Sequence, residues 1–214
     1  MNAAIEESRA APLRRFLAGF ALALMATSWP LWTPQHVFPQ VPAFAGLGRL
    51  PDAWQWLCLA GVLAALIAAL VAPRDSVLGP RSLLLFGLLM PVLMASDQHR
   101  WQPWAYQLVL TSLPLATLSA AESWPLLRLL TVSIYLYSGW SKCDVTFLDD
   151  LGQQFVARLM AVVHDPSLDQ WSLEVRRAVA GALAIGELLI GGALLWGRTR
   201  RVGLWAAVAS HLAL

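Results

Sequence analysis

A bundle of membrane-spanning α-helices is the fold class that the sequence predicts. Of the 214 residues, 58% are hydrophobic and 13% are charged, whereas soluble domains have about 45–50% and about 25%. Long apolar stretches recur along the chain, and no strand-like alternation of apolar and polar residues interrupts them. Because lipid offers no partner for backbone polar groups, such stretches form helices. The predicted fold is therefore all-α and polytopic.

Seven apolar segments approach the length of about 20 residues that a spanning helix needs. They are 16–32, 54–72, 82–95, 104–121, 125–141, 178–197 and 202–214. They predict about six or seven spans in a single transmembrane domain, with N-terminal helices in 16–124 and a core in 125–214. The last segment after Gly203 spans only about 16 Å at 1.5 Å per residue. We therefore expect the chain to be a C-terminally truncated fragment.

Prolines and polar residues modify three of these segments. Pro91 lies in the short segment 82–95, which we expect to be a tilted or broken helix. Pro114 should kink the fourth segment. Only residues 122–124 separate the fourth segment from the fifth, which predicts a tight helical hairpin at this point.

One stretch, 145–163, is amphipathic rather than uniformly apolar. Apolar side chains recur there at steps of three and four residues: Phe147, Leu151, Phe155, Leu159 and Val162. This spacing is typical of a helix that lies in the membrane interface. It ends at 164–166 and serves either as a connector on the headgroups or as a lid over a cavity.

The distribution of basic residues predicts a cytoplasmic N-terminus. With that orientation nine arginines lie inside: Arg9, Arg14, Arg15, Arg74, Arg81, Arg128, Arg198, Arg200 and Arg201. Six basic residues lie outside: Arg49, Arg100, Lys142, Arg158, Arg176 and Arg177. Lys142 is the only lysine among fifteen basic residues, a usage typical of a GC-rich bacterial genome. The expected location is a bacterial cytoplasmic membrane.

The charge and the cysteine content argue against several functional classes. The net charge of +2 does not indicate a nucleic-acid partner. Cys58 and Cys143 form no CxxC pair, which removes thioredoxin-type chemistry and cysteine-based zinc sites. We predict no metal site, and we expect His36, His99 and His164 to face solvent in loops.

Two ionisable residues lie within apolar segments, where charged side chains are costly and usually functional. Glu187 and His211 are each twelve residues from Thr199, the centre of the predicted turn between the last two segments. Equal offsets in an antiparallel hairpin place two residues at equal depth. The spacing therefore predicts that Glu187 and His211 meet, either as a polar centre or as a contact that joins two helices.

The fifth segment supplies further candidates. Arg128 lies near its start, Tyr135 and Gly139 in its second half, and Lys142 at its end. A lysine at a helix end usually extends to the interface, but one held in an apolar cavity becomes a usable base. Gly191, beside Gly192 in the next segment, either admits a neighbouring helix or leaves room for a flat ligand.

Residues 135–144, with the sequence YLYSGWSKCD, resemble the YxxAGxxKLD motif of the vitamin K-dependent gamma-carboxylase-like (HTTM) family. The hairpin from Glu187 to His211 and the DQHRW sequence at 97–101 resemble two further features of that family. This resemblance implies that Lys142 is a candidate catalytic base acting on a quinone-type cofactor, with Glu187 and His211 beside it. It also implies that Arg128, Tyr135, Gly139 and Gly191 line the cavity. Ser141 and Cys143 depart from the motif.

A second family shares part of this pattern. Arg128, Gly139-x-x-Lys142, Gly186-Glu187 and Gly191-Gly192 are similar to the small DoxX/MauE-type membrane proteins, which are associated with redox partners. The two resemblances leave two functions open. A catalytic module with a lipid- or quinone-sized cavity predicts a buried Lys142. A non-catalytic membrane partner of a redox protein predicts that Gly191 and Gly192 line a contact. Without an internal repeat, a transporter is a weaker third possibility.

Overall fold

The computed structural model describes residues 3–35, 39–74, 76–162 and 171–213, and the regular elements in these ranges are all helices. This confirms the predicted all-α class. The chain divides into two compact units, Met1–Leu126 and Leu127–Leu214. Each unit is described separately below.

Unit 1 contains four long helices and three short ones. The long helices are α1 (Ala3–Thr27), α3 (Asp52–Val71), α4 (Leu78–Ala95) and α5 (Pro103–Thr117). The short ones are α2 (Trp29–Trp32) and the 3-10 turns η1 (Leu47–Arg49) and η2 (Gln98–Arg100). The predicted segment 16–32 is therefore two helices, because α1 ends at Thr27 and α2 begins anew at Trp29, with Pro30 in its first turn.

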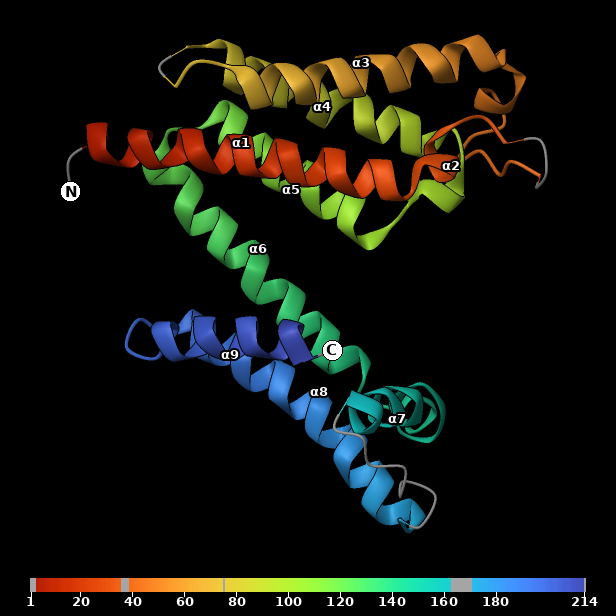
Figure 1. The fold of residues 1–214 in the computed structure, drawn as a ribbon, viewed down its shortest axis with the longest axis vertical. Coiled ribbons are helices and arrows are strands. Elements are labelled where there is room, and N and C mark those ends of the chain that lie inside the picture. The colour runs from red at the N-terminus through yellow and green to blue at the C-terminus, as the bar shows by residue number, and fades with distance from the viewer. Residues whose placement is uncertain (1–2, 36–38, 75, 163–170, 214) are drawn as a thin grey trace. The chain divides into compact units, whose positions relative to one another are not determined.

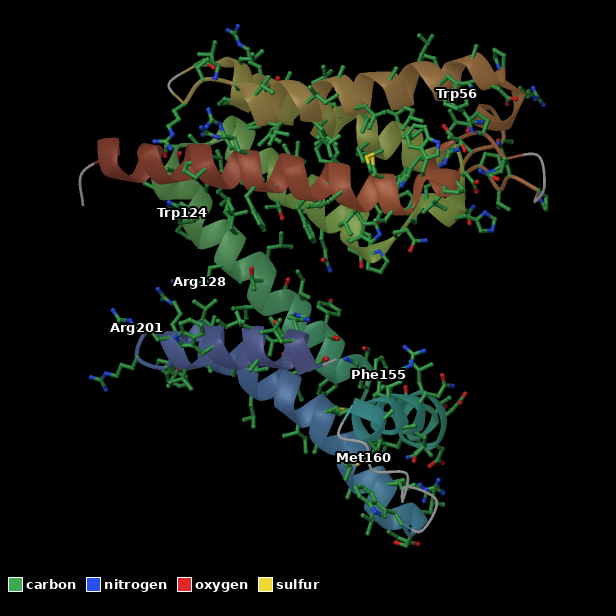
Figure 2. All side chains as sticks on the ribbon, viewed as in Figure 1. Trp56, Trp124, Arg128, Phe155, Met160 and Arg201 are labelled. Carbon is green, nitrogen blue, oxygen red and sulfur yellow. The ribbon has the colours of Figure 1, made fainter. Side chains whose placement is uncertain are left out.

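The four long helices of unit 1 form one bundle. Helix α4 packs between α3 and α5, and α1 packs against all three. Figure 1 shows the four lying lengthwise beside one another. Large apolar side chains fill the centre, among them Phe86, Leu66 and Leu115. The outer surface is also apolar; Trp56 of α3, for example, is half exposed (Figure 2). An apolar outer surface is what a bundle surrounded by lipid requires.

A buried arginine holds one end of this bundle together. Arg100 has no exposed surface and donates hydrogen bonds to the carbonyls of Leu31 (3.0 Å), Leu93 (3.2 Å) and Thr33 (3.1 Å), and to Gln55 Oε1 (2.8 Å). Burial lowers the pKa of Arg100, while the nearby Asp97 raises it. Arginine remains protonated in proteins, so these four acceptors are bound by a charged donor. Two segments distant in sequence, residues 31–33 and helix α3, and the end of α4 are thereby fixed to η2.

Two predicted boundaries in this unit differ from the structure. Helix α4 is continuous from Leu78 to Ala95 despite Pro91, so the expected break is absent; the residues around Pro91, including Met90, Leu93 and Met94, are buried in the bundle and hold the helix together. The turn expected at 122–124 lies earlier, because Leu118 is extended and α6 (Ala120–Ser141) begins two residues after it.

The start of α6 is a capping box. Glu122 Oε2 accepts hydrogen bonds from the Ser119 backbone N–H (3.1 Å) and from Ser119 Oγ (2.7 Å). A carboxylate at the third helical position that reaches back to a serine cap satisfies a donor that the helix leaves unpaired. Glu122 therefore starts a helix and does not belong to a turn.

Among its described residues, unit 2 contains the rest of α6 and four further helical elements. These are the π-helical turn η3 (Phe147–Leu151) continued by α7 (Gly152–Val162), then α8 (Leu173–Leu195) and α9 (Arg200–Ala213). Ser172 caps α8 by accepting the N–H of Val175 (3.4 Å). Helices α8 and α9 form a hairpin, and α7 packs against α8.

Residues 147–162 form the predicted amphipathic helix, whose expected end at 164–166 lies outside the described residues. Its buried face includes Phe147 and Val156, and its acidic residues are exposed. Gly152 lies so close to α8 that a β-carbon there would be 2.9 Å from Ala180 Cβ. The apolar face of this helix therefore packs on α8.

An ion pair joins the same two elements. Arg177 of α8 donates to both carboxylate oxygens of Asp149, with Nε–Oδ1 and Nη2–Oδ2 distances of 2.5 and 2.8 Å. The hydrogen bonds from Arg177 lower the pKa of Asp149 below its ordinary value of 3.8.

This pair predicts a pH dependence. A depressed folded-state pKa stabilises the fold at pH values above the unfolded pKa, and the contribution is lost as the pH falls through the folded pKa. Asp149→Asn should therefore lower the thermal midpoint at pH 7 and not at pH 2. The decrease at pH 7 should be small, because the pair is partly exposed and screened by solvent. Thermal melting in detergent checks this, with Asp150→Asn as control. An equal effect at both pH values would contradict the assignment.

Four of the described helices are long and apolar enough to cross a membrane: Ala10–Thr27, Asp52–Val71, Leu78–Ala95 and Leu173–Leu195. Helices α5 and α9 are shorter, with 15 and 14 residues, or about 21–23 Å at 1.5 Å per residue. Helix α6 has 22 residues but carries Glu122 and Arg128. The architecture is that of a helical membrane bundle.

Candidate functional site

Three helices of unit 2 enclose the candidate polar residues. Apolar side chains of α6, α8 and α9 form a small core, namely Val132, Tyr135, Ile190, Leu194 and Ala207. Helix α9 approaches α8 closely because Gly203 lies at their contact, where a β-carbon would be 2.9 Å from the Leu194 backbone nitrogen. The sequence therefore needs glycine at 203 to close this hairpin.

Lys142 and Glu187 form an ion pair between the end of α6 and the middle of α8. Lys142 Nζ bonds Glu187 Oε1 and also donates to Ser138 Oγ at 3.0 Å, one helical turn earlier. The side chains of Lys142 and Glu187 are 21% and 20% exposed. The second oxygen, Glu187 Oε2, is buried and has no hydrogen-bond partner among the described residues. The two charges thus neutralise each other in a mostly apolar surrounding.

His211 bonds Tyr135 and not Glu187. The distance from Tyr135 OH to His211 Nε2 is 2.9 Å, and the two rings lie 5.9 Å apart. The predicted direct pair of Glu187 and His211 is therefore corrected: each residue has a separate partner on α6. The reason is the position of the turn. Helix α8 ends at Leu195 and α9 begins at Arg200, so the centre of the turn lies between residues 197 and 198. Glu187 precedes this centre by 10.5 residues, and the residue the same distance after it is 208, not His211.

Gly139 and Gly191 lie where α6 and α8 touch. A β-carbon at Gly139 would be 2.8 Å from Leu188 Cγ and 2.9 Å from the Ala184 carbonyl oxygen. A β-carbon at Gly191 would be 2.9 Å from Leu136 Cδ2. In contrast, a β-carbon at Gly186 or Gly192 would meet no described atom within 4 Å. Gly139 and Gly191 thus permit close helix packing, as small residues do in membrane bundles.

Arg128 lies apart from this site. It is exposed on α6 (Figure 2), and fourteen residues separate it from Lys142, which corresponds to about 21 Å along a helix. The other polar candidates, by contrast, fall into two pairs: Lys142, just after α6, with Glu187 of α8, and Tyr135 of α6 with His211 of α9.

The chemistry of the site follows from its hydrogen bonds. Glu187 Oε1 and Ser138 Oγ both accept hydrogen bonds from Lys142 Nζ, so a substrate that approaches Lys142 competes with these two acceptors. Next to it, Cys143 is a free, exposed cysteine whose Sγ donates to the Gly139 carbonyl at 3.3 Å. Among the described residues, no group of three or more His, Cys, Asp or Glu side chains is arranged to hold a metal ion.

Sequence reasoning missed two partners. Ser138 lies four residues before Lys142, a spacing that brings side chains together on one helix face, and this signal was available. The hydrogen bond between Tyr135 and His211 joins residues 76 apart, and no local pattern indicates it.

The fold and the site define a multi-pass helical membrane protein with paired polar side chains among its C-terminal helices. A family model, Methylamine utilisation protein MauE, matches residues 116–214. The match covers the helices that carry the Lys142–Glu187 and Tyr135–His211 pairs. It supports the DoxX/MauE-type resemblance, whereas the carboxylase-like resemblance gains no support. Comparisons with curated proteins and with solved structures gave no significant match.

Proposed function

We propose that this chain is a MauE-type membrane protein that serves as a non-catalytic partner of a redox protein in the same membrane. The observation that carries the proposal is the coincidence of the family match, 116–214, with the α6–α8–α9 site. Within the site, Gly139 and Gly191 lie at helix contacts, and Lys142 is bound to Glu187. The contact at Gly191 and the bound state of Lys142 favour a packed structural module over a quinone- or lipid-binding cavity with a free base, although Gly192 meets no described atom and Lys142 has the burial that a catalytic module also predicts.

In this proposal the polar pairs set the register of three helices. A buried ion pair contributes little net stability but penalises alternative packings in which either charge is unpaired. The chain presents the resulting helical surface to its partner within the lipid bilayer. The excess of arginine in the predicted inner connections, nine basic residues against six, supports a cytoplasmic N-terminus in a bacterial cytoplasmic membrane.

Lys142→Arg distinguishes this function from catalysis. Arginine keeps the positive charge and can pair with Glu187, but it does not act as a base at neutral pH. The test strain is a methylotrophic bacterium that lacks its own MauE protein. We expect the natural chain to restore its growth on methylamine, and Lys142→Arg to give a growth rate within about twofold of that of the natural chain.

Lys142→Met is the matched control, because it removes the charge while keeping a similar length. It should restore growth poorly and reduce the amount of folded protein in the membrane. Loss of growth with Lys142→Arg, at a normal protein level, would instead support a catalytic lysine. Failure of the natural chain itself would count against a MauE-type function.

A further inference from the structure

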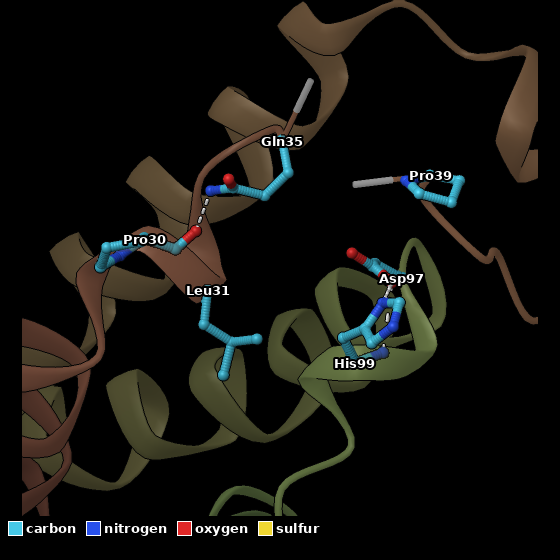
Figure 3. Close-up of a pocket in the computed structure, with 6 residues that line it drawn as sticks. All are labelled: Pro30, Leu31, Gln35, Pro39, Asp97 and His99. Carbon is cyan, nitrogen blue, oxygen red and sulfur yellow. Dashed lines mark hydrogen bonds and ion pairs between the residues drawn. The ribbon is translucent and has the colours of Figure 1, made fainter. Parts of the chain in front are cut away.

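A pocket of about 480 Å³ lies at one end of unit 1, outside the residues that the family model matches. Figure 3 shows the described residues that line it: Pro30, Leu31, Gln35, Pro39, Asp97 and His99. The first two come from α2, and the last two come from η2 and its cap. Most of the lining is apolar, and the volume is within the range of ligand pockets, about 300–1,000 Å³.

The pocket contains the carboxylate of a buried residue. Asp97 is 3% exposed, and its Oδ1 accepts hydrogen bonds from His99 Nδ1 (2.8 Å), the His99 backbone N–H (3.2 Å) and the Val41 backbone N–H (3.4 Å). No described residue donates to Oδ2, and Figure 3 shows one carboxylate oxygen directed into the pocket. A mostly buried carboxylate with an unfilled acceptor is costly, so it favours a ligand that supplies a donor.

The other two polar side chains also offer acceptors. When the neutral imidazole of His99 donates Nδ1–H to Asp97, its Nε2 is an acceptor, and the ring is exposed. Gln35 Nε2 is occupied by the carbonyl of Pro30 and by Thr33 Oγ1 (3.1 Å), which leaves the amide oxygen Oε1 free of donors from described residues. The polar atoms available in this pocket are therefore acceptors.

The nearest fixed positive charge does not supply the missing donor. Arg100 is close to Asp97 in sequence, but its guanidinium donates to Leu31, Leu93, Thr33 and Gln55. It moderates the negative potential of Asp97 without bonding it in the described structure. His99 is the remaining titratable group among the described residues that line the pocket.

From these observations we propose that the pocket binds an organic ammonium ion with an apolar body. A primary ammonium has three N–H donors and no acceptor, which complements Asp97 Oδ2, His99 Nε2 and Gln35 Oε1. Its positive charge pairs with the buried carboxylate, and Pro30, Leu31 and Pro39 contact the apolar body. A bare metal ion fits less well, because Asp97 and His99 are the only acidic or histidine side chains among the described lining residues.

The test uses the full chain in detergent micelles at pH 7.5, with benzylammonium as the probe and isothermal titration calorimetry as the readout. Benzyl alcohol has the same apolar body without the charge, and benzyltrimethylammonium has the charge without N–H donors. We expect benzylammonium to bind at least tenfold more tightly than either analogue. Equal binding of all three, or no binding of benzylammonium, would overturn the proposal.

Two variants place the binding in this pocket. Asp97→Asn keeps an oxygen that caps η2 but removes the charge, and it should weaken benzylammonium binding at least tenfold. Leu31→Trp fills the pocket without changing its charge and should also abolish binding. Asp149→Asn in unit 2 is the control and should bind normally. Unchanged binding in both pocket variants would place the amine elsewhere and reject the assignment.

Discussion

Replacing Arg100 by lysine is expected to lower the stability of the protein by about 3–5 kcal/mol. The guanidinium of Arg100 is fully buried and donates four hydrogen bonds, three to carbonyls and one to Gln55. An ammonium group has three donors on a flexible chain and does not reproduce the planar fork. Acceptors left without a donor each cost about 1–3 kcal/mol.

The measurement is thermal melting in detergent, where this loss corresponds to roughly 6–20 °C for a chain of this length. Arg81→Lys is the matched control, because Arg81 is exposed on α4, and such substitutions usually change stability by less than about 0.5 kcal/mol. Similar midpoints for Arg100→Lys and the natural chain would show that the carbonyl contacts of Arg100 do not hold the bundle together.

Gly139→Leu is expected to separate α6 from α8 and to destabilise unit 2 by about 3 kcal/mol. Even a β-carbon at this position would be 2.9 Å from the backbone oxygen of Ala184 and 2.8 Å from Leu188 Cγ. The side chain of Leu188 can move aside, but the carbonyl of Ala184 is part of the α8 backbone and cannot move without the helix. The two helices must therefore shift, which also stretches the Lys142–Glu187 ion pair.

Gly186→Leu provides the matched control on α8. The same substitution meets no described atom within 4 Å of its β-carbon, so the helix should gain propensity and lose no contact. The measurement is protease resistance and thermal melting of both variants side by side. If Gly186→Leu is as damaging as Gly139→Leu, then close packing of α6 on α8 is not what Gly139 provides.

Hydropathy predicted the helical class and located most helices, since the length of an apolar stretch is a local property. The helix ends depended on single side chains that hydropathy ignores. Glu122, for example, counted as a polar break, yet it caps α6 through Ser119. Pro91 was expected to tilt or break its helix, yet α4 is continuous through it, with its neighbours Met90, Leu93 and Met94 buried in the bundle.

The candidate site was predicted in composition but not in pairing. Lys142, Glu187, Tyr135 and His211 all lie in the polar contacts of unit 2. Their partners depend on the register of the α8–α9 hairpin. The predicted turn centre, Thr199, is about one and a half residues too late, and this shifts the α9 residue expected opposite Glu187 by three positions. The role of Arg100 was missed because its acceptors are mainly backbone carbonyls. Every residue has such a carbonyl, so the sequence does not indicate which ones bind an arginine.

The most direct test of the site is a double-mutant cycle on Lys142 and Glu187. Lys142→Met and Glu187→Gln each leave a mostly buried charge without its partner, so each should lower stability by about 1–3 kcal/mol, less than a fully buried pair would lose. The double variant leaves no unpaired charge, so it should be at least as stable as the less stable of the two single variants. Strictly additive losses would contradict the ion pair between α6 and α8, and with it the proposed packing of unit 2.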